Sequence, residues 1–176
     1  MIVVKLGGSL YDHPALRAGL NRWLETVPTP ILLVPGGGAF ADAVRAFDRL
    51  HGIGEWAAHR ASIRSMGVAA ETLMSIISIG GVHVLDADLY CREHDQLPHS
   101  WDVTSDSIAL RMAMLKSAEK LILLKSLDRP EGTWESLAEN DFVDRHFPIL
   151  AKSTDVPIEV VNFRRHLDGY MNVEST

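Results

Sequence analysis

The chain has 176 residues, of which 47% are hydrophobic and 23% are charged. This composition is typical of a globular chain that buries a sizeable core, and we expect one domain over residues 1–176. The formal net charge of −6 argues against a general nucleic-acid binder, and no apolar run approaches the length of a membrane span, so neither partner is expected. Cys91 is the only cysteine and the sequence starts without a secretory pattern, which together favour a reducing, cytoplasmic location.

The first predicted strand, Ile2–Lys5, ends in a lysine and runs into a glycine turn. Such a turn leaves backbone N–H groups open to an anion because no Cβ blocks the approach, and the ammonium group of Lys5 adds a positive charge beside them. The donors expected here belong to Gly7, Gly8 and Ser9.

A second turn of the same kind follows the predicted strand Ile31–Val34. It consists of Gly36, Gly37 and Gly38 and leads into a helix. Two strand-to-glycine turns in one small chain indicate two anions held close together, which is the geometry that a phosphoryl transferase needs.

The rest of the chain alternates between apolar runs and helical patterns. Three further strands are expected at Val82–Leu85, Leu121–Leu124 and Ile158–Asn162, all short and rich in Val, Ile and Leu, as buried parallel strands are. Helices are expected where apolar residues recur with helical spacing: from Phe40 to Leu50, from Ile63 to Ile77, from Ile108 to Leu115, from Asp141 to about Ser153, and over Arg164–Met171. This order predicts an α/β fold, a three-layer αβα sandwich with a mostly parallel central sheet.

Residues 101–106 (WDVTSD) lead into the helix that contains Ile108. Ligands of open α/β sheets bind beyond the C-terminal strand ends, where both glycine turns are expected as well. Thr104, Ser105 and Asp106 are also good first-turn residues for any helix, so on these residues alone a plain N-cap is as well supported as a ligand site.

Metal-ligating side chains crowd residues 86–99. They are Asp86, Asp88, Cys91, Glu93, His94, Asp95 and His99. Their spacing matches no zinc or calcium pattern, so we expect a solvated loop here and no metal site built by the protein.

Three segments in order resemble the motifs of the amino-acid kinase family, which includes acetylglutamate, aspartate, uridylate and isopentenyl phosphate kinases. Residues 5–9 (KLGGS) match its opening K-x-G-G-S, and residues 36–38 match the glycine loop that receives the acceptor. Residues 104–109 (TSDSIA) resemble its S/N-x-D-x-L-A element, whose aspartate orients the catalytic lysines. The resemblance implies the fold of this family and a kinase activity.

Segments further along the chain are similar to one branch of this family, the kinases of methanofuran biosynthesis. The similarity runs from Ile2 to Gly169 and rests on residues 99–101, 143–152, 160–162 and 167–169. It implies phosphorylation of (5-aminomethylfuran-3-yl)methyl phosphate by ATP, with Mg²⁺ bound mainly through the nucleotide phosphates.

The segment after the fourth predicted strand departs from the family. Residues 125–129 (KSLDR) stand where relatives carry a T-D-V-D-G-like loop, and no G-G-M-x-x-K element follows. The comparison implies a shortened nucleotide-binding half.

The resemblance also implies roles for single residues. Lys5 is the expected cation at the transferred phosphoryl group, and Asp106 is expected to orient it. Lys125 either replaces the nucleotide-side lysine that the chain lacks or extends into solvent. Trp101 either contacts the acceptor or packs in the core. The residues expected at the acceptor are Gly36, Gly37, Gly38, Trp101, Thr104 and Ser105.

Two alternative functions stay open at this point. One is a kinase for another phosphate acceptor, such as isopentenyl phosphate. The other is a catalytically impaired homologue that binds a ligand or serves as a regulatory subunit. Members of the family often dimerise through a long helix, so the apolar stripe from Ile63 to Ile77 is a candidate homodimer surface, although such a stripe is more often core.

Overall fold

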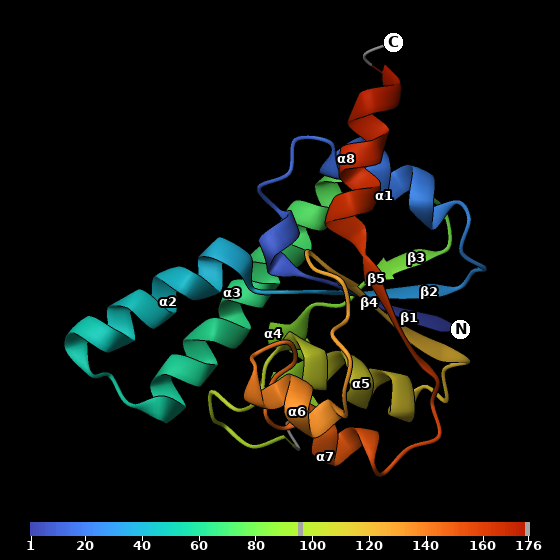
Figure 1. Ribbon diagram of the computed structural model, residues 1–176. Coiled ribbons are helices and arrows are strands. Elements are labelled where there is room, and N and C mark those ends of the chain that lie inside the picture. The colour runs from blue at the N-terminus through green and yellow to red at the C-terminus, as the bar shows by residue number, and fades with distance from the viewer. Residues whose placement is uncertain (95–96, 175–176) are drawn as a thin grey trace.

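Five parallel strands form one sheet in the computed structural model, which describes residues 1–94 and 97–174 (Figure 1). The strand order is β3-β2-β1-β4-β5, and every neighbouring pair is parallel. The strands are β1 (Ile2–Leu6), β2 (Ile31–Pro35), β3 (Val82–Val84), β4 (Lys120–Lys125) and β5 (Ile158–Asn162). The predicted strands are thus confirmed, and the last one has the expected bounds.

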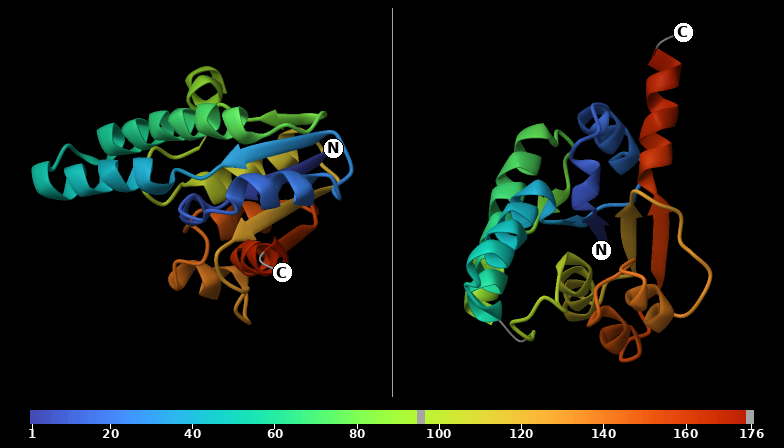
Figure 2. Two further views of the ribbon diagram at one scale, coloured as in Figure 1. Left: turned by 90° about the horizontal axis from the view of Figure 1, so that it is seen from above. Right: turned by 60° about the vertical axis from the view of Figure 1, so that its left-hand side comes forward.

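Helices cover both faces of this sheet, which confirms the three-layer sandwich (Figures 1 and 2). One face carries α1 (Leu16–Leu24) and α8 (Phe163–Glu174), and the other carries α5 (Ser105–Leu115), α6 (Trp134–Glu139) and α7 (Phe147–Ala151). A short 3₁₀ turn, η1 (Gly8–Leu10), follows β1. The remaining helices are α2 (Gly38–His51), α3 (Glu55–Ile76) and α4 (Ala87–His94).

Alternating side chains of the central strand face the two layers. Ile2, Val4 and Leu6 pack with the apolar residues of α1 and α8, whereas Val3 packs with those of α5. All residues of β1 and β2 are buried, as expected for strands that are covered on both faces. Lys5 is therefore held on a rigid, central strand, with its neighbours Val34 and Leu123 on either side.

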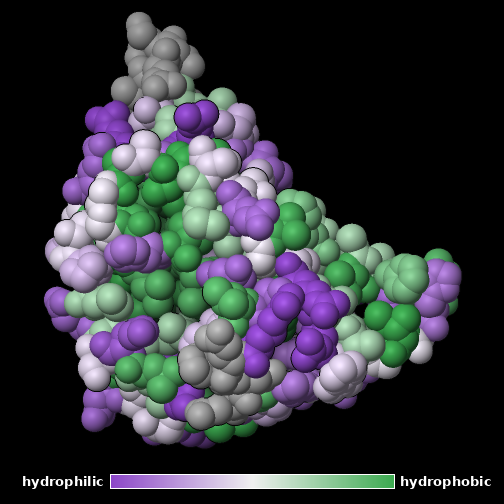
Figure 3. All heavy atoms as spheres, turned by 180° about the vertical axis from the view of Figure 1, so that it is seen from behind, coloured by the Kyte–Doolittle hydropathy of each residue, from purple (hydrophilic) through white to green (hydrophobic). Residues whose placement is uncertain are grey.

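Helices α2 and α3 project beyond the sheet as an antiparallel arm (Figures 1 and 2). The apolar stripe predicted for α2 is not core, because Phe47 and Leu50 keep 54% and 78% of their surface exposed. The reason is the geometry of the arm: α2 packs on α3 and lies away from the sheet, so one side of it meets solvent. Figure 3 shows apolar surface on this arm.

The stripe of α3 packs within the chain itself. Ile63 and Met66 join one core layer and Leu73 joins the other, and all three are buried. This stripe therefore serves the core, and its use as a homodimer surface is not supported.

Two further local predictions were wrong. The helix expected from Asp141 to Ser153 begins only at Phe147, because Pro148 has no N–H and fits only the first turn of a helix, and Asp141 has a left-handed φ of 56°. The loop expected over residues 86–99 contains α4, while Asp95 lies outside the described residues. Among the residues that the structure describes, no three His, Cys, Asp or Glu side chains gather as a metal site, and no helix is long and apolar enough to cross a membrane.

Candidate active site

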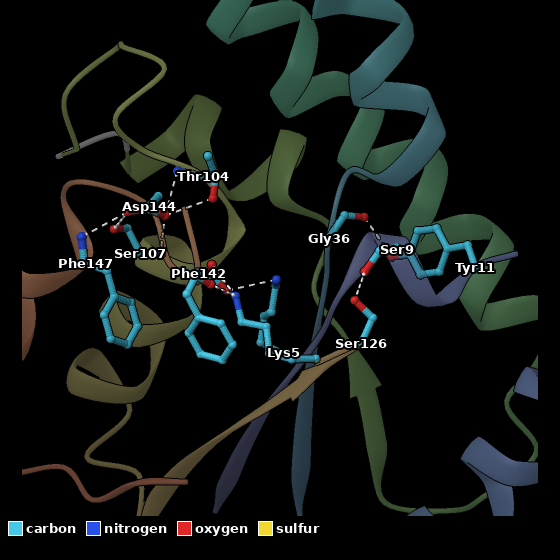
Figure 4. Close-up of polar contacts among 12 residues, drawn as sticks. Lys5, Ser9, Tyr11, Gly36, Thr104, Ser107, Ser126, Phe142, Asp144 and Phe147 are labelled. Carbon is cyan, nitrogen blue, oxygen red and sulfur yellow. Dashed lines mark hydrogen bonds and ion pairs between the residues drawn. The ribbon is translucent and has the colours of Figure 1, made fainter. Parts of the chain in front are cut away.

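The two glycine turns pack directly against each other at the C-terminal ends of β1 and β2. A Cβ atom on Gly8 would lie 2.2 Å from the backbone nitrogen of Gly38, which itself has a φ of 53°. The Gly36 N–H donates to the Leu6 carbonyl at 2.8 Å, and the Tyr11 hydroxyl donates to the Gly36 carbonyl at 2.7 Å (Figure 4). Only glycine permits this backbone-to-backbone contact, so the turns form one rigid unit.

The first turn differs in one respect from the prediction. The N–H of Gly7 donates to the Leu124 carbonyl at 2.9 Å, so it continues the sheet and does not face an anion. Gly8 and Ser9 do line a pocket, and the Ser9 hydroxyl donates to the Ser126 hydroxyl at 3.0 Å.

A buried carboxylate joins the two candidate lysines. The Nζ atom of Lys5 lies 2.8 Å from Oδ1 of Asp106, and Nζ of Lys125 donates to Oδ2 of the same carboxylate at 2.8 Å. Lys125 also donates to the Phe142 carbonyl at 2.6 Å (Figure 4). The side chains of Lys5 and Asp106 are each only 6% exposed. We call this arrangement the Lys5–Asp106–Lys125 bridge.

Burial and charge act against each other in this bridge. Burial alone would raise the pKa of Asp106, but the adjacent ammonium groups of Lys5 and Lys125 hold it well below its usual range. For Lys125, burial and then the like charge of Lys5 lower the pKa to about 8, although Asp106 and Asp144 favour its protonated form. Two positive charges are thus concentrated around one negative charge, and the excess is available to anionic ligands.

Two adjoining pockets open beside the bridge, one at Lys5 and the other at Asp106 and Lys125. The smaller pocket, of about 360 Å³, is lined by Lys5, Gly8, Ser9, residues 36–38 and the middle of α3. The larger pocket, of about 630 Å³, is lined by Lys125, Asp106, residues of α2 and residues 141–145. The two share the side chains of Arg45, Trp101, Thr104 and Asp141, so the pockets meet beside the bridge.

The expected acceptor residues all line the smaller pocket. They are Gly36, Gly37, Gly38, Trp101, Thr104 and Ser105. Trp101 is half-buried, its indole N–H donates to Asp48 at 3.3 Å, and the guanidinium of Arg45 lies 5.1 Å from its ring centre. Trp101 therefore forms part of the pocket wall between α2 and α5. Of the two alternatives that the sequence left open, contact with a ligand or packing in the core, this position is compatible with the first.

Asp144 is a site residue that the sequence analysis did not single out. Its carboxylate accepts hydrogen bonds from the backbone and side chain of both Thr104 and Ser107, and from the Phe147 N–H (Figure 4). The available signal was its place before α7, but a carboxylate that caps a helix 37 residues earlier in the chain leaves no local pattern. By contrast Lys152, another residue of the 143–152 similarity, forms an exposed ion pair with Glu135 and lines neither pocket of the bridge.

Known proteins share both the fold and the sequence pattern. No family model matches the chain. A [5-(aminomethyl)furan-3-yl]methyl phosphate kinase of Methanocaldococcus jannaschii is 29% identical, over 98% of this chain and 92% of that protein. Among solved structures, a uridylate kinase of Archaeoglobus fulgidus superposes with a TM-score of 0.67 at 18% identity, covering 96% of each chain. A UMP kinase of Bacillus anthracis superposes with a TM-score of 0.63 at 14% identity, covering 96% of this chain and 91% of that one.

These similarities extend over nearly the whole chain, so the shortened segment after β4 does not change the overall topology. The resemblance predicted from the sequence is confirmed: the chain has the amino-acid kinase fold and is a homologue of kinases, enzymes that transfer phosphoryl groups.

Proposed function

We propose that the chain transfers the terminal phosphoryl group of ATP to the phosphate of [5-(aminomethyl)furan-3-yl]methyl phosphate, giving the diphosphate and ADP. The observation that carries this proposal is the Lys5–Asp106–Lys125 bridge between two adjoining pockets. Phosphoryl transfer asks a protein mainly to position two anions and to stabilise the charge on the transferred group, and the bridge offers one lysine to each side. The similarity to a kinase of that name supports the choice of acceptor.

The acceptor phosphate is assigned to the smaller pocket. Lys5, the Gly8–Ser9 turn and the 36–38 turn converge there, and both turns are fixed by their backbone contacts. A phosphate monoester is already ionised near neutral pH, so its oxygen attacks the phosphorus without a general base. The half-buried indole of Trp101 offers a flat surface to the furan ring.

The triphosphate of ATP is assigned to the larger pocket, where Lys125 takes the place of the lysine that the shortened half lacks. The cationic side chains of Arg45, Arg49 and Arg145 also line this pocket and can contact the phosphates, although several aspartates line it as well. Mg²⁺ would neutralise the charge between the two ligands. Asp106 is engaged by two lysines and Asp144 by five hydrogen bonds, so neither is available as a ligand. We assign the ion mainly to the nucleotide phosphates, with Asp48, Asp102 and Asp141 as the other carboxylates that line this pocket.

Calorimetry and a turnover assay test this proposal together. We would titrate Mg·ATP into the purified protein with and without the furan phosphate, and follow diphosphate formation by ³¹P NMR. Saturable binding of both ligands and conversion to the diphosphate are expected, and Lys5→Ala should slow the conversion by about 10²–10³-fold. Binding of the furan phosphate without any nucleotide binding would contradict the kinase and support the alternative of a ligand-binding or regulatory subunit.

The acceptor assignment has its own control. Isopentenyl phosphate and UMP are also phosphate monoesters, but the group that carries the phosphate is different. Their phosphates should therefore compete for Lys5 and the two glycine turns. A higher kcat/KM for the furan phosphate than for either is expected if the wall of the smaller pocket selects the acceptor. A preference for isopentenyl phosphate would replace the acceptor and leave the phosphoryl transfer intact.

We also propose a cytoplasmic location and a homodimer. The single cysteine supports the former. The exposed Phe47, Leu50 and Trp56 of the arm support the latter, because a second copy could cover them. Light scattering of the wild type and of Leu50→Ser tests the homodimer: a monomeric wild-type chain would contradict it.

A further inference from the structure

One carboxylate collects hydrogen bonds from three places in the fold. The Asp144 carboxylate accepts from the Thr104 N–H and hydroxyl at 2.9 Å each, and from the Ser107 N–H at 2.9 Å and the Ser107 hydroxyl. It also accepts from the Phe147 N–H at 2.9 Å, at the start of α7. Asp144 thus caps the first turn of α5 from a distant segment, a task that Thr104 does not perform with its own side chain.

The segment that contains Asp144 is connected to two members of the Lys5–Asp106–Lys125 bridge. Asp106 occupies the first turn of α5, between the two residues that Asp144 holds. Two residues before Asp144, the Phe142 carbonyl accepts from Lys125 at 2.6 Å, and the Phe142 ring centre lies 5.2 Å from the same ammonium. Residues 142–144 therefore hold the carboxylate of the bridge through α5 and one of its lysines directly.

The negative charge of Asp144 also acts on Lys125. The ionisable groups that act on Lys125 are Lys5 from β1, Asp106 from α5 and Asp144 from the segment before α7. Burial, followed by repulsion from Asp106, raises the pKa of Asp144, while the hydrogen bonds from Ser107 and Thr104 oppose that shift. The hydrogen bonds that Asp144 accepts stabilise its ionised form, and the resulting negative charge favours the ammonium form of Lys125.

We infer that Asp144 is a positioning residue for phosphoryl transfer: it fixes Asp106 through the first turn of α5 and anchors the segment whose Phe142 carbonyl holds Lys125, without touching either ligand's reacting atoms. The inference rests on the proposed function, since it assigns Asp144 to the bridge that carries that function. It predicts that the loss of the carboxylate charge affects the chemical step, while the loss of one donor affects only the alignment of α5.

Three variants separate these effects. Asp144→Asn keeps the shape and removes the charge, and Ser107→Ala removes one donor and leaves the charge. Asp86→Asn is the matched control, because Asp86 accepts from the Leu89 N–H in the first turn of α4, and neither residue lines the pockets of the bridge. For Asp144→Asn we expect kcat to fall by about 10–100-fold, as for misplaced reacting groups, with the alkaline limb of kcat/KM moved to lower pH. Ser107→Ala should lower kcat with the limb unmoved.

The control should change neither kcat nor the pH profile. Wild-type kcat and an unmoved limb in Asp144→Asn would overturn the inference. If Asp144→Asn does not fold, the outcome rests on Ser107→Ala, for which an unchanged kcat would overturn it. If the wild type shows no turnover, the proposed function fails separately.

An NMR titration of the Lys125 side chain then decides: a lower pKa in Asp144→Asn supports the inference, and an unchanged pKa overturns it.

Discussion

The two pockets beside the bridge are built in different ways. Main-chain atoms of two glycine turns, fixed at the ends of the central strands β1 and β2, form the floor of the smaller pocket. Side chains from the projecting helix α2 and from the irregular residues 141–145 form most of the larger one. Close backbone contacts between the two turns fix the first, whereas the second depends on long side chains such as Arg49 and Arg145. The smaller pocket, to which we assign the acceptor, is therefore built largely from fixed backbone, whereas the larger pocket, to which we assign ATP, is built from side chains.

The largest effect is expected when the smaller pocket loses its cation. Lys5→Ala removes the charge nearest the transferred group and should lower kcat by about 10²–10³-fold, as the loss of one transition-state donor does. Lys120→Ala is the matched control, because Lys120 begins β4 at the opposite end of the sheet in an exposed ion pair with Glu159. Initial rates at saturating ligands measure the effect. A wild-type kcat in Lys5→Ala would mean that the smaller pocket only binds.

The carboxylate that pairs with both lysines should affect stability and rate together. Asp106→Asn leaves two buried lysines without their counter-charge, so we expect the free energy of unfolding to fall by about 3–5 kcal/mol and kcat to fall with it. Urea denaturation measures the first quantity and the kinase assay the second. Glu159→Gln, which removes a carboxylate from an exposed pair, should change neither noticeably. An Asp106→Asn chain as stable as the wild type would show that the bridge is not buried in solution.

The rigidity of the smaller pocket is tested at its tightest contact. A Cβ on Gly8 would lie 2.2 Å from the Gly38 nitrogen, so Gly8→Ala must push the two turns apart. We expect KM for the acceptor to rise about tenfold, with a smaller change in KM for ATP. At Gly80 a Cβ would meet no heavy atom within 4 Å, so Gly80→Ala is the control. Equal increases in both KM values would show that the turns do not discriminate between the pockets.

The smallest effect concerns pH and belongs to the larger pocket. The lowered pKa of Lys125, about 8, means that this lysine is charged below that pH and neutral above it. If the charge is needed, kcat/KM should fall about tenfold per pH unit above the pKa. Lys125→Arg keeps a charged side chain at all these pH values and should remove the alkaline limb, even if it lowers the plateau. A limb that persists unchanged in Lys125→Arg would assign the titration to another group.

Local patterns were enough to predict much of the fold. Short Val, Ile and Leu runs predicted the five strands, since a strand covered on both faces has no polar side and is recognisable within a few residues. The helix around Phe40–Leu50 was predicted correctly, but which side of it is buried depends on neighbours in space. The stripe of α2 has the spacing of a core helix, yet Phe47 and Leu50 are exposed because the arm extends past the sheet. The amphipathic α1 was not predicted, although Leu16, Leu20 and Leu24 have helical spacing and are buried in it.

The sequence by itself determined the chemistry of the site: Lys5, two glycine turns and Asp106 stand at the ends of recognisable elements, and backbone geometry brings parallel strand ends to one edge. How these groups are paired depends on the tertiary structure. It occupied the Gly7 N–H within the sheet, placed Lys125 on the same carboxylate as Lys5, and brought Asp144 under α5. Such contacts join residues far apart in the chain, and a pairing fixed by packing leaves no periodic signal in the sequence.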